Sequence, residues 1–322
     1  MRLFHVAAFA ALAVGCKDSG TDTTDDTTED VVDARREFPE APLGAVVWDT
    51  PEWTIPAFSD KQFCYALTYD GDDVGITAQA NYQSPNGHHV VIFGTTVSER
   101  EMPDGTQWDC TTPESMDMGN LDPLIIGGDI AYGPEGVLNS FILPAGMGAS
   151  LNNGQRVVIQ SHYINATDKA VLVRDEVQLT VVPEDEVEIW AAPFAQSIDG
   201  FKIPAGAVDY NETFDCVWEA DYNIVYLGGH MHEWGTAFKT DRTVDGVTDT
   251  LYEVPVWDPI FRDAPMYQQY EQGEFTVKPG DVFTTSCTWT NDTSNDLPFP
   301  NEMCVTFGMV FPSKVPVVCS PQ

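Results

Sequence analysis

Histidine is the residue type whose placement in this sequence points most directly to chemistry. Apart from His5 near the N-terminus, the histidines form a pair, a single residue and a second pair: His88-His89, His162 and His230/His232. Neutral imidazole is the commonest metal-binding side chain. Histidines grouped in this way indicate metal binding rather than scattered surface positions.

The second pair has the spacing H-x-H, in His230-Met231-His232. In a strand, positions i and i+2 face the same side, so both imidazoles can reach one metal ion. Gly228 and Gly229 precede the pair and allow close backbone approach. Two stacked strand histidines without a metal would show the same spacing, so the other histidines decide its meaning.

The first pair follows Asn86-Gly87, which is a turn signal. Adjacent strand residues face opposite sides, so His88 and His89 can bind one ion only where the backbone is irregular, as at a turn or strand end. His162, taken alone, is more typical of a buried histidine. Three histidines in the first half and two in the second therefore predict two sites, one in each half.

The second site lacks a third ligand, because no Asp or Glu near it has an obvious chelating spacing. A thioether would suit Cu(I). The chain has nine Met, and spacing does not choose among them.

Short runs of β-branched and aromatic residues between turn signals predict the elements that position these histidines. Residues 156–163 follow Asn-Asn-Gly, and residues 281–289 follow Lys-Pro-Gly and alternate in polarity. This pattern is typical of antiparallel sandwiches and jelly rolls. A polar break at residues 182–186 divides the body into domains at 41–185 and 186–322. The fold class that we expect is all-β, with two tandem jelly-roll or β-sandwich domains facing across a cleft.

A weakly repeated order of predicted elements in the two halves suggests an internal duplication. Residues 141–165 and 275–291 both read as strand, Pro-Gly turn, strand and Asn-containing loop. N-glycosylation sequons occur at Asn165, Asn211 and Asn291, and in a bacterial lipoprotein they carry no meaning.

The N-terminus has the features of an export signal. Residues 1–15 combine Arg2 with a short apolar run, and Leu12-Ala13-Val14-Gly15-Cys16 resembles a bacterial lipobox, in which the cysteine is lipidated. Residues 16–40 are mostly acidic and polar, and we expect a disordered tether. Membrane association is then expected only through the lipid on Cys16, at a bacterial cell envelope facing the periplasm or the exterior.

The composition excludes one class of partner and indicates the compartment of the protein. The 322 residues include 50 Asp plus Glu against 15 Lys plus Arg, a net charge of -35, which argues against nucleic acid as a partner. Of seven Cys, six remain after Cys16, and an even number in an exported chain predicts three disulfides. Sequence spacing alone leaves their pairing open.

In order along the chain, His88-His89, Gln160-x-His162, His230-x-His232 and Glu302-Met303-Cys304 resemble the copper type II, ascorbate-dependent monooxygenases, the family of peptidylglycine α-hydroxylating and dopamine β-monooxygenases. The resemblance covers about residues 41–319. It implies insertion of one oxygen atom of O₂ into a C–H bond of a small-molecule substrate, with two copper ions per chain and ascorbate or a similar one-electron donor.

The resemblance also implies a role for each site residue. His88, His89 and His162 would hold an electron-transfer copper, and His230, His232 and Met303 an oxygen-binding copper, while Gln160 would help to connect the sites. The implied disulfides are Cys64–Cys110, Cys216–Cys319 and Cys287–Cys304, and the implied fold is a pair of jelly rolls across a solvent-filled cleft.

Two departures from the family bear on the substrate. Peptide-amidating members have Arg at the position of Gly228 and Tyr at that of Phe307, so this chain lacks their anchor for a peptide carboxylate. We therefore expect a substrate other than a glycine-extended peptide, in a less polar pocket to which Phe307 and Trp234 contribute.

Other functions fit fewer of these residues. A non-enzymatic copper-binding lipoprotein, for storage or sensing, would need both histidine groups and is the alternative. A metal-free interaction module has no use for Met303 or clustered histidines. A zinc hydrolase would need a general base, and none has a suitable spacing.

Overall fold

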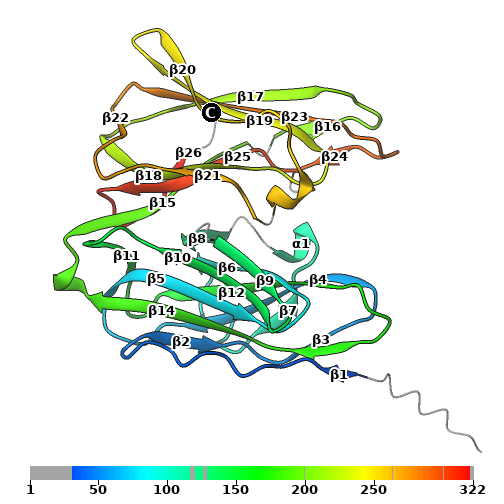
Figure 1. Cartoon of the computed structure of the whole chain (residues 1–322). Helices are drawn as coiled ribbons and strands as arrows, with labels where there is room; N and C mark the ends of the chain where they lie inside the picture. The colour runs from blue at the N-terminus through cyan, green and yellow to red at the C-terminus, as the bar shows by residue number, and fades with distance from the viewer. Residues whose placement is uncertain are drawn as a thin grey trace, which may run out of the picture.

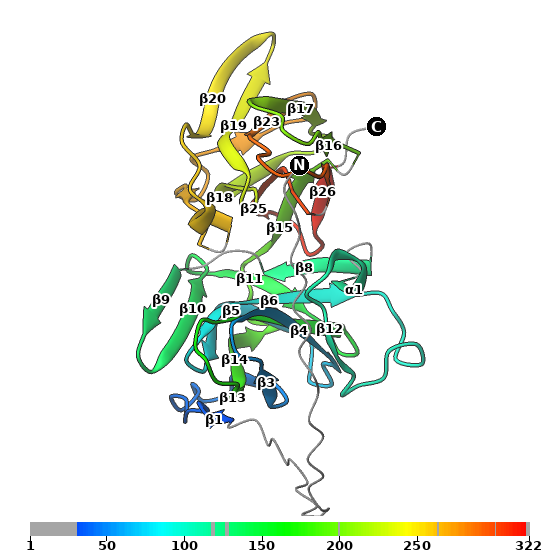
Figure 2. The same cartoon turned by 90° about the vertical axis from the view of Figure 1, so that its right-hand side faces the viewer.

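The computed structural model describes residues 31–116, 120–125, 129–198, 200–262, 264–299 and 301–319. In these residues the chain forms two β lobes, one coloured blue to green and the other green to red (Figures 1 and 2). The all-β class with sandwiched sheets is confirmed. Cys16 and the export signal lie outside the described residues.

In the described residues, the N-terminal lobe contains fourteen strands and one short α-helix. They are β1 (Val32–Asp33), β2 (Val46–Asp49), β3 (Trp53–Ile55), β4 (Ser59–Thr68), β5 (Val74–Gln83), β6 (Gly87–Thr95), β7 (Gln107–Asp109), α1 (Pro113–Met116), β8 (Leu121–Ile125), β9 (Asp129–Gly133), β10 (Gly136–Ile142), β11 (Met147–Leu151), β12 (Arg156–Asn165), β13 (Val171–Val173) and β14 (Asp175–Pro183).

The 3₁₀ helix η2 (Glu184–Glu186) connects the lobes and lies within the polar segment 182–186. The C-terminal lobe consists of β15 (Ile189–Ser197), β16 (Lys202–Ile203), β17 (Tyr210–Val217), β18 (Tyr222–His230), β19 (Gly235–Val244), β20 (Val247–Val254), η3 (Pro259–Arg262), β21 (Tyr267–Gln269), β22 (Thr276–Val277), β23 (Val282–Trp289), β24 (Leu297–Pro298), β25 (Val305–Phe311) and β26 (Val317–Cys319).

One sheet is shared by both lobes. Its strands run in the order β2-β14-β5-β11-β15-β25-β18-β21, and the crossing point is the parallel pair β11–β15. The N-terminal lobe adds a five-stranded sheet β7-β4-β12-β6-β8, and the C-terminal lobe adds a four-stranded sheet β17-β23-β19-β20. Each lobe is thus a sandwich, with the shared sheet as one layer.

The strand β12 is buried on both of its faces, and this positions His162. Val157 and Ile159 pack into the main core between the sheets. Val158 packs into a second cluster with Met116 of α1. The residues of even number, including His162, therefore share the face of the sheet on which α1 lies. Both views place α1 and β8 on the side of this lobe that faces the other lobe.

The strand β23 shows why the alternating sequence forms a strand. Phe283, Thr285, Cys287 and Trp289 are buried, and the residues between them are partly exposed. This alternation is the one expected from the sequence, because successive side chains of a strand point to opposite faces of the sheet.

All three disulfides pair as the family resemblance implied: Cys64–Cys110, Cys216–Cys319 and Cys287–Cys304. Three disulfides indicate a protein exported to an oxidising compartment. None of the helices in the described part of the chain has the length and hydropathy needed to cross a bilayer.

The predicted tether is wrong for residues 31–40. Val32 and Asp33 pair with β13, and Ala34 is buried. The Arg174 guanidinium donates to the carbonyl oxygen of Arg36. The segment is held in place by the backbone pairing of Val32 and Asp33 and by the burial of Ala34. The polar composition of the segment gave no sign of these contacts. The rest of the predicted tether, residues 16–30, lies outside the described residues.

Matching asparagines support the repeated order of elements in the two halves. The amide nitrogen of Asn165 donates to the carbonyl oxygens of Ile55, Pro56 and Lys169. Asn291 donates in the same way to those of Ile203, Pro204 and Asn295. Each side-chain oxygen accepts from a Thr two residues later. Asn165 and Asn291 are therefore buried residues that hold neighbouring loops by hydrogen bonds.

Candidate metal centres

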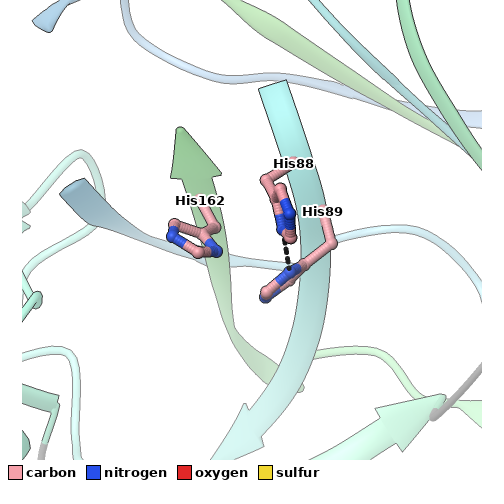
Figure 3. A group of neighbouring side chains, drawn as sticks. All are labelled: His88, His89 and His162. Carbon is pink, nitrogen blue, oxygen red and sulfur yellow. Dashed lines mark hydrogen bonds between the residues drawn. The ribbon is translucent and has the colours of Figure 1, made fainter. Parts of the chain in front are cut away.

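His88, His89 and His162 converge in the N-terminal lobe. One ring nitrogen of each lies within 4.8 Å of those of the other two, and the Nδ1 atoms of His88 and His89 are 3.5 Å apart. Figure 3 shows the three rings turned toward one another, two from β6 and one from β12. Nitrogens that bind one ion at about 2 Å each lie within about 4 Å of one another, so small side-chain rotations complete a site.

A β-bulge allows two adjacent residues to contribute to this group. His162 pairs with His89, whereas Tyr163 pairs with Gly87, so His88 is the extra residue of β6. A bulge re-aims a side chain that a regular strand would direct to the opposite face. The backbone at His88 is therefore irregular, which is the condition predicted from the sequence for both histidines to bind one ion. Asn86, at φ 70°, forms the turn that leads into the bulge.

Side chains outside the triad contact its histidines. Asp60 Oδ1 lies 2.6 Å from His162 Nε2. Tyr132, on the β9–β10 hairpin, donates its hydroxyl to the carbonyl oxygen of His88 at 3.3 Å, and its ring centroid lies 5.9 Å from that of His88. Asp60 therefore orients His162, and Tyr132 covers His88.

Gln160, the predicted connecting residue, is buried two residues before His162. Its amide nitrogen donates to Gln62 Oε1 and lies 3.4 Å from Met116 Sδ. Both partners belong to the N-terminal lobe. Gln160 thus supports the strand pair β4–β12 beside the triad and uses its donor within its own lobe.

His230 and His232 form the second histidine group, with ring centroids 5.1 Å apart. His230 is the last residue of β18, and His232 lies in the loop beyond it. The expected strand pleat therefore ends before His232. His232 Nδ1 lies 3.0 Å from the carbonyl oxygen of Asn301, and the Trp257 indole donates to the carbonyl oxygen of His232 at 3.1 Å. The contact of Nδ1 leaves Nε2 as the ring nitrogen of His232 that could bind a metal ion.

Glu302 connects this loop to the segment that contains Met303. Its carboxylate accepts from the backbone N–H groups of His232 and Trp234 at 3.0 and 2.9 Å, and from the Trp289 indole at 2.9 Å. Glu302 is fully buried, and this burial raises the pKa of its carboxyl group. Charge-assisted bonds of this kind hold a loop in one geometry.

Met303 lies between Glu302 and the disulfide-bonded Cys304, and is partly exposed. Two residues further on, Val305 pairs with His230 in the ladder β18–β25. The register and the Glu302 contacts therefore bring Met303 into the neighbourhood of the second group. The hydrogen bonds of Glu302 on one side and the disulfide of Cys304 on the other restrict the backbone of Met303.

The residues expected to line a pocket are largely packed. Phe307 is 3% exposed and belongs to the main core, so it does not line open space. A Cβ at Gly228 would lie 2.8 Å from Phe307 Cζ and 2.9 Å from the Met266 carbonyl oxygen. Trp234 is half-buried, and its indole donates to Asp292. No room remains at Gly228 for a longer side chain without displacing Phe307.

Sequence reasoning gave Asp60, Tyr132 and Glu302 no role. Asp60 and Glu302 are two of 50 acidic residues, and only the strand register shows which of them face a histidine. Glu302 was part of the motif that contains Met303, and this adjacency was the one signal available.

A hollow of about 400 Å³ lies between the lobes and is lined in part by Thr95, Asn152, Pro193 and Val315. Asp60, Tyr132 and Glu302 do not line it.

No protein-family model matches the chain, and no curated protein matches it. Among solved structures, it is similar to PNGase F, a glycosylasparaginase from Flavobacterium meningosepticum, at 10% identity and a TM-score of 0.40, over 85% of this chain and 97% of that one. The STIV MCP is similar at 7% identity and a TM-score of 0.35, over 82% and 98%.

Proposed function

We propose that the protein is a copper-dependent monooxygenase that hydroxylates a C–H bond of a small organic substrate, with O₂ and a one-electron donor such as ascorbate. The observation that carries the proposal is the convergence of His88, His89 and His162 through a β-bulge. A bulge that brings adjacent histidines together has no evident value for packing, and bulges are frequent at functional sites.

The side chains of both groups fit copper. Imidazole nitrogen suits copper in both oxidation states, and thioether sulfur favours Cu(I). The first group offers three imidazoles, and the second offers His230, His232 and Met303. Oxygen ligands, which hard cations prefer, are absent from both proposed sets. The two groups thus differ in the way that an electron-transfer site and an oxygen site would require.

Bound copper would supply one-electron transfer and the activation of O₂ for insertion into a C–H bond. The chain's own residues would hold and orient the ions. His162 is 1% exposed and keeps bulk water from one side of the first group. At the second group, Glu302 and the Asn301 carbonyl fix the loop and the ring of His232. Rigid support of this kind preserves ligand geometry through a change of oxidation state.

The proposed substrate is not anchored by a carboxylate at the position of Gly228. That position carries no cation, and Phe307 fills the adjacent space. The nearby Arg262 forms an ion pair with Glu233, so its charge is already balanced. These contacts support a small substrate other than a glycine-extended peptide. We further propose that the exported chain is anchored in a bacterial cell envelope by a lipid on Cys16.

The deciding experiment measures copper stoichiometry on the purified chain, and then ascorbate-dependent O₂ uptake over a panel of small substrates. We expect two copper ions per chain and uptake with some substrates. Met303→Ile should abolish uptake while the triad keeps its copper. Met102→Ile is the matched control, because Met102 is partly buried in the N-terminal lobe and packs against the cluster that contains Cys64 and Cys110.

The possible outcomes separate the alternatives. Unchanged uptake in Met303→Ile would overturn the assignment of the second group. Two copper ions without reductant-dependent uptake on any substrate would favour a copper storage or sensing lipoprotein. Efficient hydroxylation of C-terminal glycine peptides would contradict the substrate inference.

A further inference from the structure

We propose that Asp60 is a positioning residue for the copper triad, and that it fixes which nitrogen of His162 faces the metal. This inference rests on the proposed copper site. Asp60 Oδ1 lies 2.6 Å from His162 Nε2. A carboxylate only accepts hydrogen bonds, so Nε2 carries the proton and donates it. The lone pair of His162 is then on Nδ1.

The geometry of the triad agrees with this tautomer. His88 and His89 approach each other through their Nδ1 atoms, 3.5 Å apart. A ring nitrogen of His162 lies within 4.8 Å of ring nitrogens of both. Figure 3 shows the His162 ring edge directed toward the other two rings. A metal-binding histidine generally donates its second N–H to a carboxylate or a carbonyl, which orients the ring and strengthens its donor nitrogen.

The strands, rather than a mobile loop, place Asp60 where it is. In the ladder β4–β12, Gln62 is opposite His162, and Asp60 is opposite Ile164. Asp60 and Gln62 share a face of β4, so Asp60 is the diagonal neighbour of His162. Gln62 is engaged with Gln160. Asp60 is therefore the residue of β4 whose charge acts on the triad.

The burial of the two partners shows what the contact contributes. The His162 side chain is 1% exposed, whereas that of Asp60 is 56% exposed. The carboxylate keeps water contact, and its negative charge lies directly behind the imidazole. An anion in this position stabilises Cu(II) more than Cu(I). Asp60 thus affects both the affinity of the triad for copper and its reduction potential.

The test uses the full chain with His230→Ala and His232→Ala, so that copper binds at the triad alone. Copper affinity is measured by competition with a chelator, the Cu(II) spectrum by electron paramagnetic resonance, and the reduction potential by redox titration. We expect Asp60→Ala to lower the affinity about 10- to 100-fold. Asp60→Asn keeps an acceptor oxygen but removes the charge, so it should lower the affinity less and raise the potential.

The control is Asp109→Asn, which breaks an ion pair with Lys61 in the same sheet. It should leave all three measurements unchanged. If Asp60→Ala fails to fold, Asp60→Asn decides, because it preserves the shape of the side chain. An Asp60→Asn variant with the parent spectrum and potential would overturn the proposal.

One further variant distinguishes this inference from the proposed function. If His162→Ala binds copper as the parent does, the triad is not the copper site, and the proposed function fails together with the inference. If His162→Ala loses copper while both Asp60 variants match the parent, only the role of Asp60 is refuted.

Discussion

At the scale of single residues, Glu302 is the side chain on which the second histidine group depends most. It is fully buried and accepts three N–H bonds, two from the loop of His232 and one from Trp289. These bonds join a loop after β18 to the segment before β25. The loop has little regular structure of its own, so the carboxylate determines its shape.

Glu302→Ala should lower the free energy of unfolding by about 3–5 kcal/mol, because three buried donors lose their acceptor. Copper stoichiometry should fall from two to one, with the triad still loaded. Urea titration and metal analysis measure the two effects. Glu274→Gln, an exposed carboxylate that accepts one backbone N–H, is the control and should change stability by less than about 0.5 kcal/mol. Retention of both copper ions in Glu302→Ala would contradict this role.

Asp175 is a second buried carboxyl group, located beside the triad strand. Tyr163 donates its hydroxyl to Asp175, and the Gln83 amide lies 3.5 Å away. Burial raises the pKa of Asp175 to about 7. In the unfolded chain the same group has a pKa of about 3.9. Between these values the folded protein holds a proton that the unfolded chain has released.

Stability should therefore fall as the pH rises from about 4 to about 7, by up to roughly 4 kcal/mol from this group. Asp175→Asn, which is neutral at every pH, should remove this contribution. The test compares urea unfolding of wild type and variant at pH 4.5 and 7.5, with the exposed Asp185→Asn as control. Equal pH slopes in wild type and Asp175→Asn would show that Asp175 does not titrate in this range.

The candidate metal ligands were predictable from the sequence, and the residues that support them were not. Histidine is rare in this chain, so its clustering carries information, and Met303 was found through a motif. Asp60 and Glu302 belong to a large acidic population. Their partners lie across strand pairs whose register depends on the whole sheet, which no local pattern reveals.

At the scale of elements, we expect the turn before β6 to control the geometry of the triad. Asn86 adopts a φ of 70°, in the left-handed region, and its carbonyl accepts from Ile164. The bulge at His88 follows immediately. Asparagine tolerates this conformation better than other non-glycine residues do.

Asn86→Val should cost about 1–2 kcal/mol, because a β-branched side chain clashes in the left-handed region. It should also weaken copper binding at the triad, since the bulge depends on the turn. Asn86→Gly is the matched control and should bind copper as wild type does. Thermal unfolding and chelator competition measure both effects. Wild-type behaviour of Asn86→Val would show that the turn does not control the bulge.

The elements themselves were partly predictable. Alternation along β23 and the run at β12 marked strands, because one or both faces pack against apolar side chains. Composition misled at residues 31–40, where the acidic and polar character predicted disorder. Pairing of β1 with β13 depends on backbone groups, and composition contains no information about backbone hydrogen bonds.

At the scale of the whole molecule, the two lobes share a hydrophobic core. Tyr226, Phe307 and Met309 of the C-terminal lobe belong to the same cluster as Phe141 and other residues of the N-terminal lobe. The rings of Phe141 and Tyr226 meet edge to face at 5.4 Å. Two domains across a cleft were expected from the sequence, whereas apolar side chains of both lobes fill part of the boundary between them.

The lobes should therefore unfold together, in one calorimetric transition. Phe141→Ala removes a ring from the shared core and should cost about 3–5 kcal/mol. It should also separate the transition into two, because the contact that couples the lobes is weakened.

Phe201→Ala is the control for this prediction. It truncates a buried ring that stacks on Trp289 within the C-terminal lobe. This control should lower the melting temperature yet keep one transition, since the boundary between the lobes is intact. Two transitions in the wild-type chain would show that the shared core does not couple the lobes. The geometry between the two histidine groups would then depend on η2 and the β11–β15 pairing alone.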